Sequence, residues 1–243
     1  MNFILIIGAT SEVAKELALL YAQNGYNLYL AARKSDTLIS FSSEIILNYN
    51  VRVELLDIDL TNLDSLDEFY HGLTPSPYGV IFVSGYMTDQ KICEIDWEET
   101  RITISVNFLG PVRLLNTIAN SFEHRKKGFI IGISSVAGER GRKSNYIYGS
   151  SKAAFSSYLS GLRNRLNASN VHVLTVKPGF IDTKMIEGLE LPRILVAKPG
   201  HVAKKIFNAQ NNMRDVIYTK SIWSIIMFFI RIIPEKVFKN LKL

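Results

Sequence analysis

The chain has 243 residues, of which 47% are hydrophobic and 21% are charged. This length supplies one well-buried domain, and the composition is that of an ordinary globular protein. The formal charge of +6 would attract phosphate groups. However, the cations are scattered, and no basic motif interleaved with aromatic residues occurs, so we expect no nucleic-acid partner. The single cysteine excludes an internal disulfide framework and fits a reducing compartment.

The first residues read as a strand that runs directly into a glycine. They lack the basic region and the cleavage site of a signal peptide. No uncharged run reaches the length of about 20 residues that is needed to span a bilayer. We therefore expect a cytoplasmic protein.

Seven apolar, strand-like runs alternate with helical patterns along the chain. The predicted strands are Asn2–Ile7, Asn27–Ala32, Val51–Leu56, Val80–Ser84, Gly128–Ile133, Val171–Lys177 and Asp215–Tyr218. Such alternation predicts an α/β fold of one doubly wound, Rossmann-type domain, in which helices cover both faces of a seven-stranded parallel sheet. Ligands of such sheets bind outside the carboxyl ends of the strands. Residues 1–220 are predicted to form the dinucleotide-binding catalytic part, and residues 221–243 a helical extension of the same domain.

The stretch from Phe129 to Leu166 combines a strand, a loop and a helix. Its apolar strand stops at two serines, and a loop rich in glycine, arginine and lysine follows. The helix is predicted from about Tyr148, because apolar residues then recur at helical spacing. These residues are Phe155, Leu159, Leu162 and Leu166.

Tyr148 and Lys152 are four residues apart and therefore project from one face of this helix. A tyrosine hydroxyl normally titrates near pH 10, and an ammonium group nearby favours the phenolate and lowers that pKa. A serine at the end of the adjacent strand could hydrogen-bond the substrate oxygen that takes the proton. The pattern therefore indicates a site for proton transfer.

The spacing of these residues resembles that of the short-chain dehydrogenase/reductase family, in which a serine precedes Tyr-x-x-x-Lys by thirteen residues. Ser135 stands at that distance from Tyr148, whereas Ser134 is one position too early. Tyr146 does not fit, because the residue four positions after it is a serine. The resemblance implies that Ser135, Tyr148 and Lys152 are catalytic. It implies the same for Asn107, which would hold a water that links the lysine to bulk solvent.

The first predicted strand ends in Gly8, and Thr10 or Ser11 can cap the helix that follows. The amino end of that helix offers backbone N–H groups and a positive dipole end to a pyrophosphate. The family resemblance therefore implies cofactor contacts from Gly8, Thr10, Ser11 and Val13.

The same turn departs from the family pattern Thr-Gly-x-x-x-Gly-x-Gly, of which only the first glycine is kept. Ile7 stands where threonine is usual, and Glu12 and Ala14 replace the second and third glycines. Alanine still permits close packing of helix and strand. A carboxylate at position 12 would repel a pyrophosphate unless it points outward.

The end of the second predicted strand carries Arg33, followed by Lys34. A site that prefers NAD usually places an acid there, which binds the ribose 2′-hydroxyl and would repel a 2′-phosphate. We therefore predict that NADP(H) is favoured over NAD(H). The alternatives are that both cations are solvated surface residues, or that Asp36 supplies the acid.

Further cofactor contacts follow from the resemblance alone. The third strand would supply Asp59 and the backbone of Leu60, although Asp57 is an alternative and Asp59 could simply cap a helix. The fourth strand has lost the family's asparagines. The contacts implied after the fourth and sixth strands are Ser84, Gly85, Pro178, Gly179, Ile181 and Thr183. The segment from Lys184 to Lys198 is predicted to be a substrate lid.

These features predict an NADP(H)-dependent reductase that converts a ketone to an alcohol, with Tyr148 as the proton donor. One alternative is a dinucleotide sensor without turnover, which the lost glycines favour. A carbonyl reductase for an unrelated small ketone is another. An epimerase or dehydratase of the extended relatives would need a longer carboxyl-terminal substrate domain.

A narrower resemblance concerns bacterial reductases of a decaprenylphosphoryl-linked ketosugar (2-ulose). The shared motifs are Gly85-Tyr86-x-x-Asp89-Gln90, Ser134–Arg140, Ser144-Asn145, Tyr148–Ser150 and Pro178–Phe180. The resemblance implies that the substrate is a small-molecule or lipid-linked ketone. Which ketone is reduced cannot be read from these residues.

The last 23 residues, 221–243, are unusually apolar. No residue from Ser221 to Ile230 is charged, Pro234 should end or kink the helix, and three lysines recur after it. Apolar aromatic residues beside lysines suit the boundary of an anionic bilayer, so this segment is predicted to dock on the inner face of the membrane. The alternatives are that it closes the substrate cleft or forms a homo-oligomer contact.

Overall fold

Seven parallel strands form the central sheet of the protein, which we describe from a computed structural model that covers residues 2–183, 186, 188 and 192–241. The strand order is β3-β2-β1-β4-β5-β6-β9, as expected for a doubly wound, single-domain α/β fold. The strands are β1 (Phe3–Ile7), β2 (Asn27–Ala32), β3 (Val53–Asp57), β4 (Gly79–Phe82), β5 (Gly128–Ile133), β6 (Val171–Lys177) and β9 (Val216–Tyr218). Every predicted strand is confirmed, with ends that differ by at most two residues.

The helices alternate with these strands. They are α1 (Glu12–Gln23), α2 (Ile39–Tyr49), α3 (Leu66–His71), α4 (Gln90–Ile95), α5 (Trp97–Ile104), α6 (Gly110–Arg125), α7 (Tyr146–Asn167), α8 (Pro199–Asn211), α9 (Ile222–Ile232) and α10 (Glu235–Phe238). Short 3₁₀ turns are η1 (Ser35–Leu38), η2 (Leu63–Ser65), η4 (Val136–Glu139) and η6 (Arg193–Leu195), and a π-helical turn, η3 (Ser105–Leu109), joins α5 to α6.

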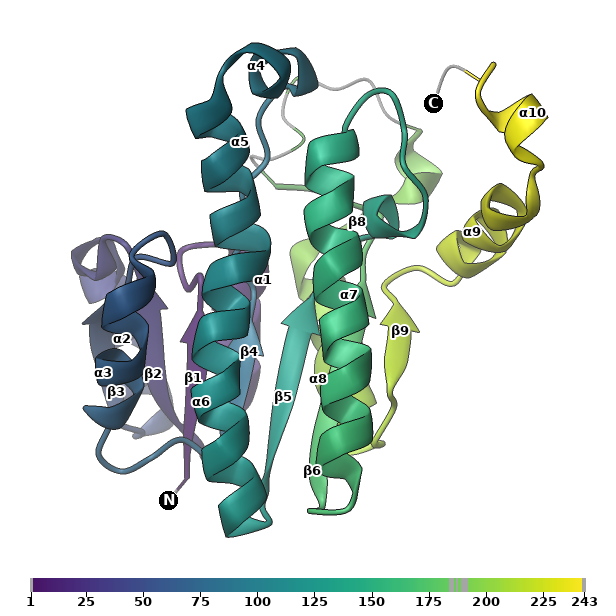
Figure 1. The fold of residues 1–243 in the computed structure, drawn as a ribbon. Coiled ribbons are helices and arrows are strands. Elements are labelled where there is room, and N and C mark those ends of the chain that lie inside the picture. Colours follow the sequence, from purple (N-terminus) through teal and green to yellow (C-terminus); the bar gives the residue numbers. More distant parts are fainter. Residues whose placement is uncertain (1, 184–185, 187, 189–191, 242–243) are drawn as a thin grey trace.

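Each face of the sheet has its own apolar core. Along β1, Ile4 and Ile6 face the cluster that α1 and α8 complete, whereas Leu5 and Ile7 face the cluster that α6 and α7 complete. Successive side chains of a strand point to opposite faces, so a strand covered on both sides is apolar throughout. Figure 1 looks onto the face covered by α6 and α7, with α1 and α8 behind the sheet.

The strand order reverses beside β1, which pairs with both β2 and β4. The loops after these strands therefore diverge and leave a crevice at the carboxyl edge, where ligands of this fold class bind. The amino end of α7 lies at the same edge (Figure 1). The fold thus brings the turn after β1 and the residues of the predicted proton-transfer site to one end of the sheet.

Among the described residues, the continuous helix Trp97–Arg125 is long and apolar enough by composition to cross a membrane. Half of its most apolar stretch is buried inside the protein. Leu115, Ile118 and Phe122 of this helix are fully buried against the sheet. It is therefore a core helix of the domain.

Two short strands were not predicted. β7 (Phe180–Ile181) and β8 (Val196–Ala197) pair in parallel as a separate small sheet. Two-residue strands carry no periodicity that a sequence could reveal. The predicted lid, Lys184 to Lys198, lies partly outside the described residues, and its described end contains η6 and β8.

The carboxyl-terminal segment forms α9 and α10, and Pro234 separates the two helices as predicted. Both lie beyond β9 at the carboxyl edge of the sheet (Figure 1). Trp223, Met227 and Phe238 are buried, so one side of the segment packs on the protein itself.

Candidate active site

The two serines after β5 have different surroundings. The Ser134 hydroxyl donates a hydrogen bond to the Lys152 carbonyl oxygen (2.9 Å) and lies 2.6 Å from the Ser156 hydroxyl. Ser134 therefore ties β5 to helix α7. The Ser135 hydroxyl accepts a hydrogen bond from the Ala137 N–H (3.1 Å) and caps η4. Of the two, Ser135 is the one that hydrogen-bonds Tyr148.

Tyr148 lies in the first turn of α7. Burial raises the pKa of Tyr148 to about 12, and the hydrogen bond with Ser135 acts in the opposite direction without cancelling it. The expectation of a lowered pKa is therefore wrong for the chain by itself, because desolvation of the phenolate outweighs the hydrogen bond with Ser135. A pKa of about 12 keeps the hydroxyl protonated at neutral pH, which is the form that can donate a proton.

Lys152 is 3% exposed, and its ammonium lies 5.8 Å from the centre of the Tyr148 ring. The ammonium donates to the carbonyl oxygens of Ile133 (3.2 Å) and Ser84 (3.5 Å), at the ends of two neighbouring strands. Burial lowers the pKa of Lys152 to about 8. The side chain therefore still carries its proton at neutral pH, and the two carbonyl oxygens fix its position.

Asn107 is 1% exposed and lies in the π-helical turn η3. Its amide oxygen accepts from the Tyr86 N–H (3.0 Å), and its amide nitrogen donates to the Tyr86 carbonyl oxygen (2.7 Å). Turns of this kind often occur at functional sites. The side chain fixes the loop after β4, whose Ser84 carbonyl oxygen accepts from Lys152. The sequence did not indicate Tyr86 as the hydrogen-bond partner of Asn107.

The turn after β1 needs the glycine at its start. Gly8 has a φ of +85°, and a Cβ there would lie 2.6 Å from the Ser84 backbone nitrogen. Both the conformation and the close approach exclude a side chain. The Ser11 hydroxyl accepts from the Ala14 N–H (3.2 Å) and is therefore the helix cap, whereas Thr10 is exposed. The turn therefore packs directly against the strand end that carries Ser84.

Two residues at the start of α1 differ in exposure. The Val13 side chain is buried in the core, so only its backbone faces the edge of the sheet. Glu12 is the first helical residue and is partly exposed. A helix leaves its first N–H groups without partners inside the helix, and these groups favour an anion.

Two cations after β2 are exposed, whereas the nearby acids accept hydrogen bonds from the backbone. Arg33 and Lys34 are exposed. Asp36, the acid that would favour NAD(H), accepts from the Thr37 N–H (2.9 Å). Asp57, at the end of β3, accepts from the Ser35 N–H (2.9 Å), which lowers the pKa of the Asp57 carboxyl group.

Asp59 follows β3 and makes local hydrogen bonds. One carboxylate oxygen accepts from the N–H (2.9 Å) and the hydroxyl (2.8 Å) of Thr61. These bonds close a turn at Asp59 and do not cap a helix, because the residue at the cap position before η2 is Asn62. The neighbouring Leu60 is buried, and a Cβ on Gly110 would lie 2.3 Å from its carbonyl oxygen. The segment is therefore held closely against α6.

The turn after β6 is held by its neighbours. The Pro178 carbonyl oxygen accepts from the Val136 N–H (2.9 Å), which joins the turn to the residue after Ser135. A Cβ on Gly179 would lie 2.0 Å from the Trp223 ring. Ile181 lies in β7, and the Thr183 hydroxyl donates to its carbonyl oxygen (3.3 Å). Gly85, by contrast, is exposed after β4.

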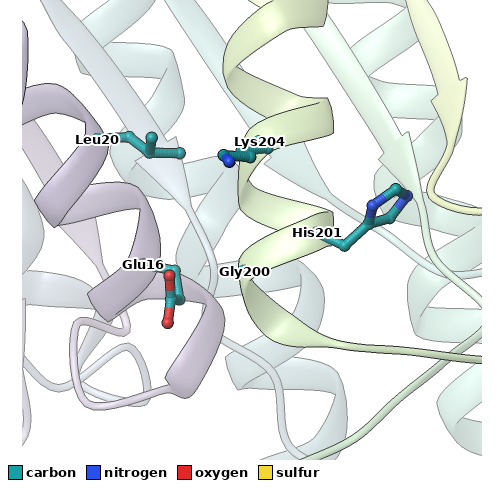
Figure 2. A pocket seen from close by; sticks show the side chains of 5 residues that line it. All are labelled: Glu16, Leu20, Gly200, His201 and Lys204. Atoms are coloured by element: carbon teal, nitrogen blue, oxygen red, sulfur yellow. The ribbon is translucent and has the colours of Figure 1, made fainter.

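A separate pocket lies between α1 and α8, on the other face of the sheet from α7. Figure 2 shows its lining residues, Glu16, Leu20, Gly200, His201 and Lys204. None of them was predicted as a site residue. The pocket is therefore distinct from the group formed by Ser135, Tyr148 and Lys152.

Comparisons with known proteins agree with this geometry. A family model for short chain dehydrogenase matches residues 2–192. An uncharacterized oxidoreductase of Mycobacterium tuberculosis is 28% identical over 98% of this chain and 96% of its own length. An uncharacterized oxidoreductase of Myxococcus xanthus is 30% identical over 74% of this chain and 72% of its own.

Solved structures share the fold. A short-chain dehydrogenase from Sphingobium yanoikuyae in complex with NADPH has a TM-score of 0.84 and 22% identity, covering 97% of each chain. One from Burkholderia cenocepacia in complex with NADP has a TM-score of 0.82 and 21% identity, covering 100% of this chain and 98% of the other. The chain belongs to the short-chain dehydrogenase family and is an oxidoreductase of that family.

Proposed function

We propose that the protein reduces a ketone to an alcohol with NADPH as the hydride donor. The observation that carries this proposal is the group of Ser135, Tyr148 and Lys152 at the carboxyl edge of the sheet, beside the turn at Gly8. The fold places such a group where a dinucleotide of this fold class binds. The residues fit that cofactor, because the glycine turn and the first N–H groups of α1 offer a surface for a pyrophosphate.

The cofactor would supply the hydride, and the chain's own residues would supply orientation and a proton. Ser135 would hydrogen-bond the carbonyl oxygen of the substrate. Tyr148, whose pKa of about 12 keeps it protonated, would donate its proton to that oxygen as negative charge develops there. Lys152 would stabilise the phenolate that remains and bind the ribose hydroxyls. Asn107 would hold the loop that orients Lys152.

The test of the proposed function is consumption of NADPH with a panel of ketones and ketosugars. A ketone-dependent loss of NADPH absorbance, with formation of the matching alcohol, is the expected result. Tight NADPH binding without turnover on the panel would instead support a dinucleotide sensor, which the lost glycines of the first turn favour.

For the cofactor, we propose that Arg33 selects NADP(H) over NAD(H). The neighbours solved with NADPH and NADP support a phosphorylated cofactor. Asp36 and Asp57 both accept hydrogen bonds from backbone N–H groups of the loop after β2. A bidentate guanidinium–phosphate contact contributes roughly 1.5–3 kcal/mol. Arg33→Gln should therefore weaken NADPH binding about ten- to a hundredfold and leave NADH binding nearly unchanged.

Calorimetric titration of both cofactors measures this difference. Arg52→Gln is the matched control, because Arg52 is an exposed arginine that precedes β3. Equal affinities of the unmodified protein for NADPH and NADH would show that Arg33 does not bind the 2′-phosphate of the cofactor.

For the substrate, we propose a lipid-linked ketosugar, with an unrelated small ketone as the alternative. The narrower resemblance of the motifs around Ser135 and Tyr148 supports the first. An alcohol dehydrogenase from Comamonas testosteroni, described as specific for bulky-bulky ketones, shares the fold with a TM-score of 0.81 and 23% identity, covering 90% of this chain and 86% of its own. The ketone panel decides between the two classes.

We further propose that residues 1–220 form the catalytic part and that residues 221–243, the carboxyl-terminal extension, dock on the inner face of the cytoplasmic membrane. Four apolar side chains of α9 are exposed between 53% and 60%. They are Ile225, Phe228, Phe229 and Ile232. Lys236 lies on α10 and Lys239 directly follows this helix. Each lysine near an anionic surface contributes about 1 kcal/mol.

Flotation with anionic liposomes at low salt tests membrane docking. The full chain should float, and the double variant Phe228→Ser, Phe229→Ser should lose most of this binding, because apolar insertion is removed. The matched control is Ile39→Ser, Leu47→Ser, which removes two exposed apolar side chains of α2. If the full chain stays in the dense fraction but sediments as a homo-oligomer that the α9 variant breaks, the face is a subunit contact.

A further inference from the structure

The loop between Ser135 and α7 reaches the carboxyl-terminal extension through Arg140. Its guanidinium donates to the carbonyl oxygens of Ile230 (2.5 Å) and Ile233 (2.6 Å), and to the Glu235 carboxylate (2.9 Å). The same group lies 3.7 Å from the centre of the Phe238 ring. Carbonyl groups at the end of a helix lack partners inside the helix and favour a cation. Arg140 therefore caps α9 and holds α10 at the same time.

The neighbouring residue, Glu139, is a buried carboxylate. One oxygen accepts from the Lys177 ammonium (2.6 Å) and the Tyr218 hydroxyl (2.8 Å), and the other lies 3.6 Å from the Arg231 guanidinium. Its side chain is only 3% exposed, and a buried charge is tolerated only with such partners. Glu139 thereby connects η4 to the ends of β6 and β9 and to α9.

The beginning of α9 contacts η6 and β7. The Trp223 indole N–H donates to the Leu195 carbonyl oxygen (3.2 Å), and its ring packs edge-on against Phe180 with centres 5.4 Å apart. Met227, one turn later, is fully buried in a cluster with Val136. Val136 directly follows Ser135, so the extension covers the residue next to the serine.

Ser135 and the two charged residues stand at opposite ends of η4. The Ser135 hydroxyl caps this turn of four residues, and Glu139 ends it. A single 3₁₀ turn fixed at one end by a cap and at the other by ion pairs leaves little freedom for the serine. A shift of Glu139 or Arg140 therefore changes the position of the Ser135 hydroxyl relative to Tyr148.

We propose that Glu139 and Arg140 are positioning residues that couple the carboxyl-terminal extension to Ser135. The extension then acts as a wall of the active site that sets the geometry of proton transfer. This inference rests on the proposed ketone reduction. It assigns the two residues no contact with substrate or cofactor.

Arg140→Gln tests the coupling, because it removes the charge and most of the contacts to α9 and α10. We expect kcat for ketone reduction to fall about 10- to 100-fold, since a misplacement of about 1 Å costs on the order of a hundredfold in rate. The Kd for NADPH should stay within about twofold, because the turn at Gly8 and the start of α1 are not altered. Arg140→Lys should recover part of kcat, since an ammonium can still donate to a carbonyl oxygen of α9.

The matched control is Arg113→Gln, which removes the ion pair between Arg113 on α6 and Asp67 on α3, away from the site. Hydrogen exchange supplies a readout that does not depend on turnover. The N–H groups of Ala137 and Gly138, which bind the Ser135 hydroxyl and carbonyl oxygen, should exchange faster in Arg140→Gln, whereas those of β1 should not.

Unchanged exchange in η4, or faster exchange with kcat unchanged, overturns the coupling. The coupling is also overturned if Arg140→Gln lowers kcat and weakens NADPH binding equally, and Arg140→Lys does not restore kcat. Such a result would mean that the substitution disturbs the protein as a whole. Should the unmodified protein turn over no ketone while the exchange in η4 responds as stated, the proposed reaction fails and the structural coupling stands.

Discussion

Tyr148→Phe is expected to lower kcat for ketone reduction by about 10²- to 10⁴-fold, the usual contribution of a positioned general acid. The substitution removes only the hydroxyl that hydrogen-bonds Ser135 and leaves the ring beside the Lys152 ammonium. The affinity for NADPH should therefore stay nearly unchanged. Steady-state kinetics and a calorimetric titration on the same preparation measure the two quantities.

Tyr146→Phe is the matched control for this substitution. Tyr146 lies two residues earlier on the same helix, and its hydroxyl donates to the Glu94 carboxylate at the exposed surface (3.1 Å). We expect almost no change in kcat. If Tyr146→Phe abolishes turnover and Tyr148→Phe does not, the register of the site is wrong. If Tyr148→Phe loses NADPH binding, its role is structural.

Trp223→Ala is expected to lower the free energy of unfolding by about 3–5 kcal/mol, the usual cost of truncating a buried large aromatic side chain. Trp223 is 4% exposed, packs on Gly179 and Phe180, and donates to the Leu195 carbonyl oxygen. Its loss leaves a cavity and an unpaired carbonyl oxygen between α9 and the turn after β6. Urea unfolding followed by circular dichroism measures the change.

Trp97→Ala is the matched control, because Trp97 is 73% exposed at the start of α5. Its free energy of unfolding should change by less than about 0.5 kcal/mol. Equal effects of the two substitutions would mean that α9 does not pack on the protein in solution. The membrane would then be the better explanation for the apolar character of the whole segment.

Five of the seven strands could be predicted because they are buried on both faces and read as nearly continuous apolar runs, whereas β3 and β9 are only partly buried. β1 illustrates this: all five of its residues are buried. The pair β7 and β8 could not be predicted, since two residues give no pattern and their pairing depends on the turn after β6. Trp223 and Met227 were expected on an apolar helix. Their burial under the loop after Ser135 depends on tertiary packing and could not be predicted from the sequence.

The sequence predicted that Tyr148 and Lys152 project from one face of a helix, because helix geometry fixes residues four apart. The choice of Ser135 followed from the family resemblance. The pKa of Tyr148 could not be predicted in the same way. A sequence shows that a cation stands nearby, but it does not show how deeply the phenol is buried, and burial decides the direction here.

Contacts between distant parts of the chain could not be predicted from the sequence either. Arg140 binds carbonyl oxygens about 90 positions away, at Ile230 and Ile233. The Asn107 side chain binds both the N–H and the carbonyl oxygen of Tyr86. In both cases the side chain binds backbone groups. Nearly every residue has such groups, so the sequence does not indicate which of them are bound.

The most direct test of the account is to follow the hydride itself. The protein is incubated with a ketone and with NADPH that carries deuterium at both C4 positions, and the alcohol is analysed by mass spectrometry and NMR. One deuterium on the carbinol carbon is expected, and none on that carbon when unlabelled NADPH is used in D₂O. An alcohol without the carbon-bound label, or NADPH that binds and is never oxidised by any ketone, would contradict it.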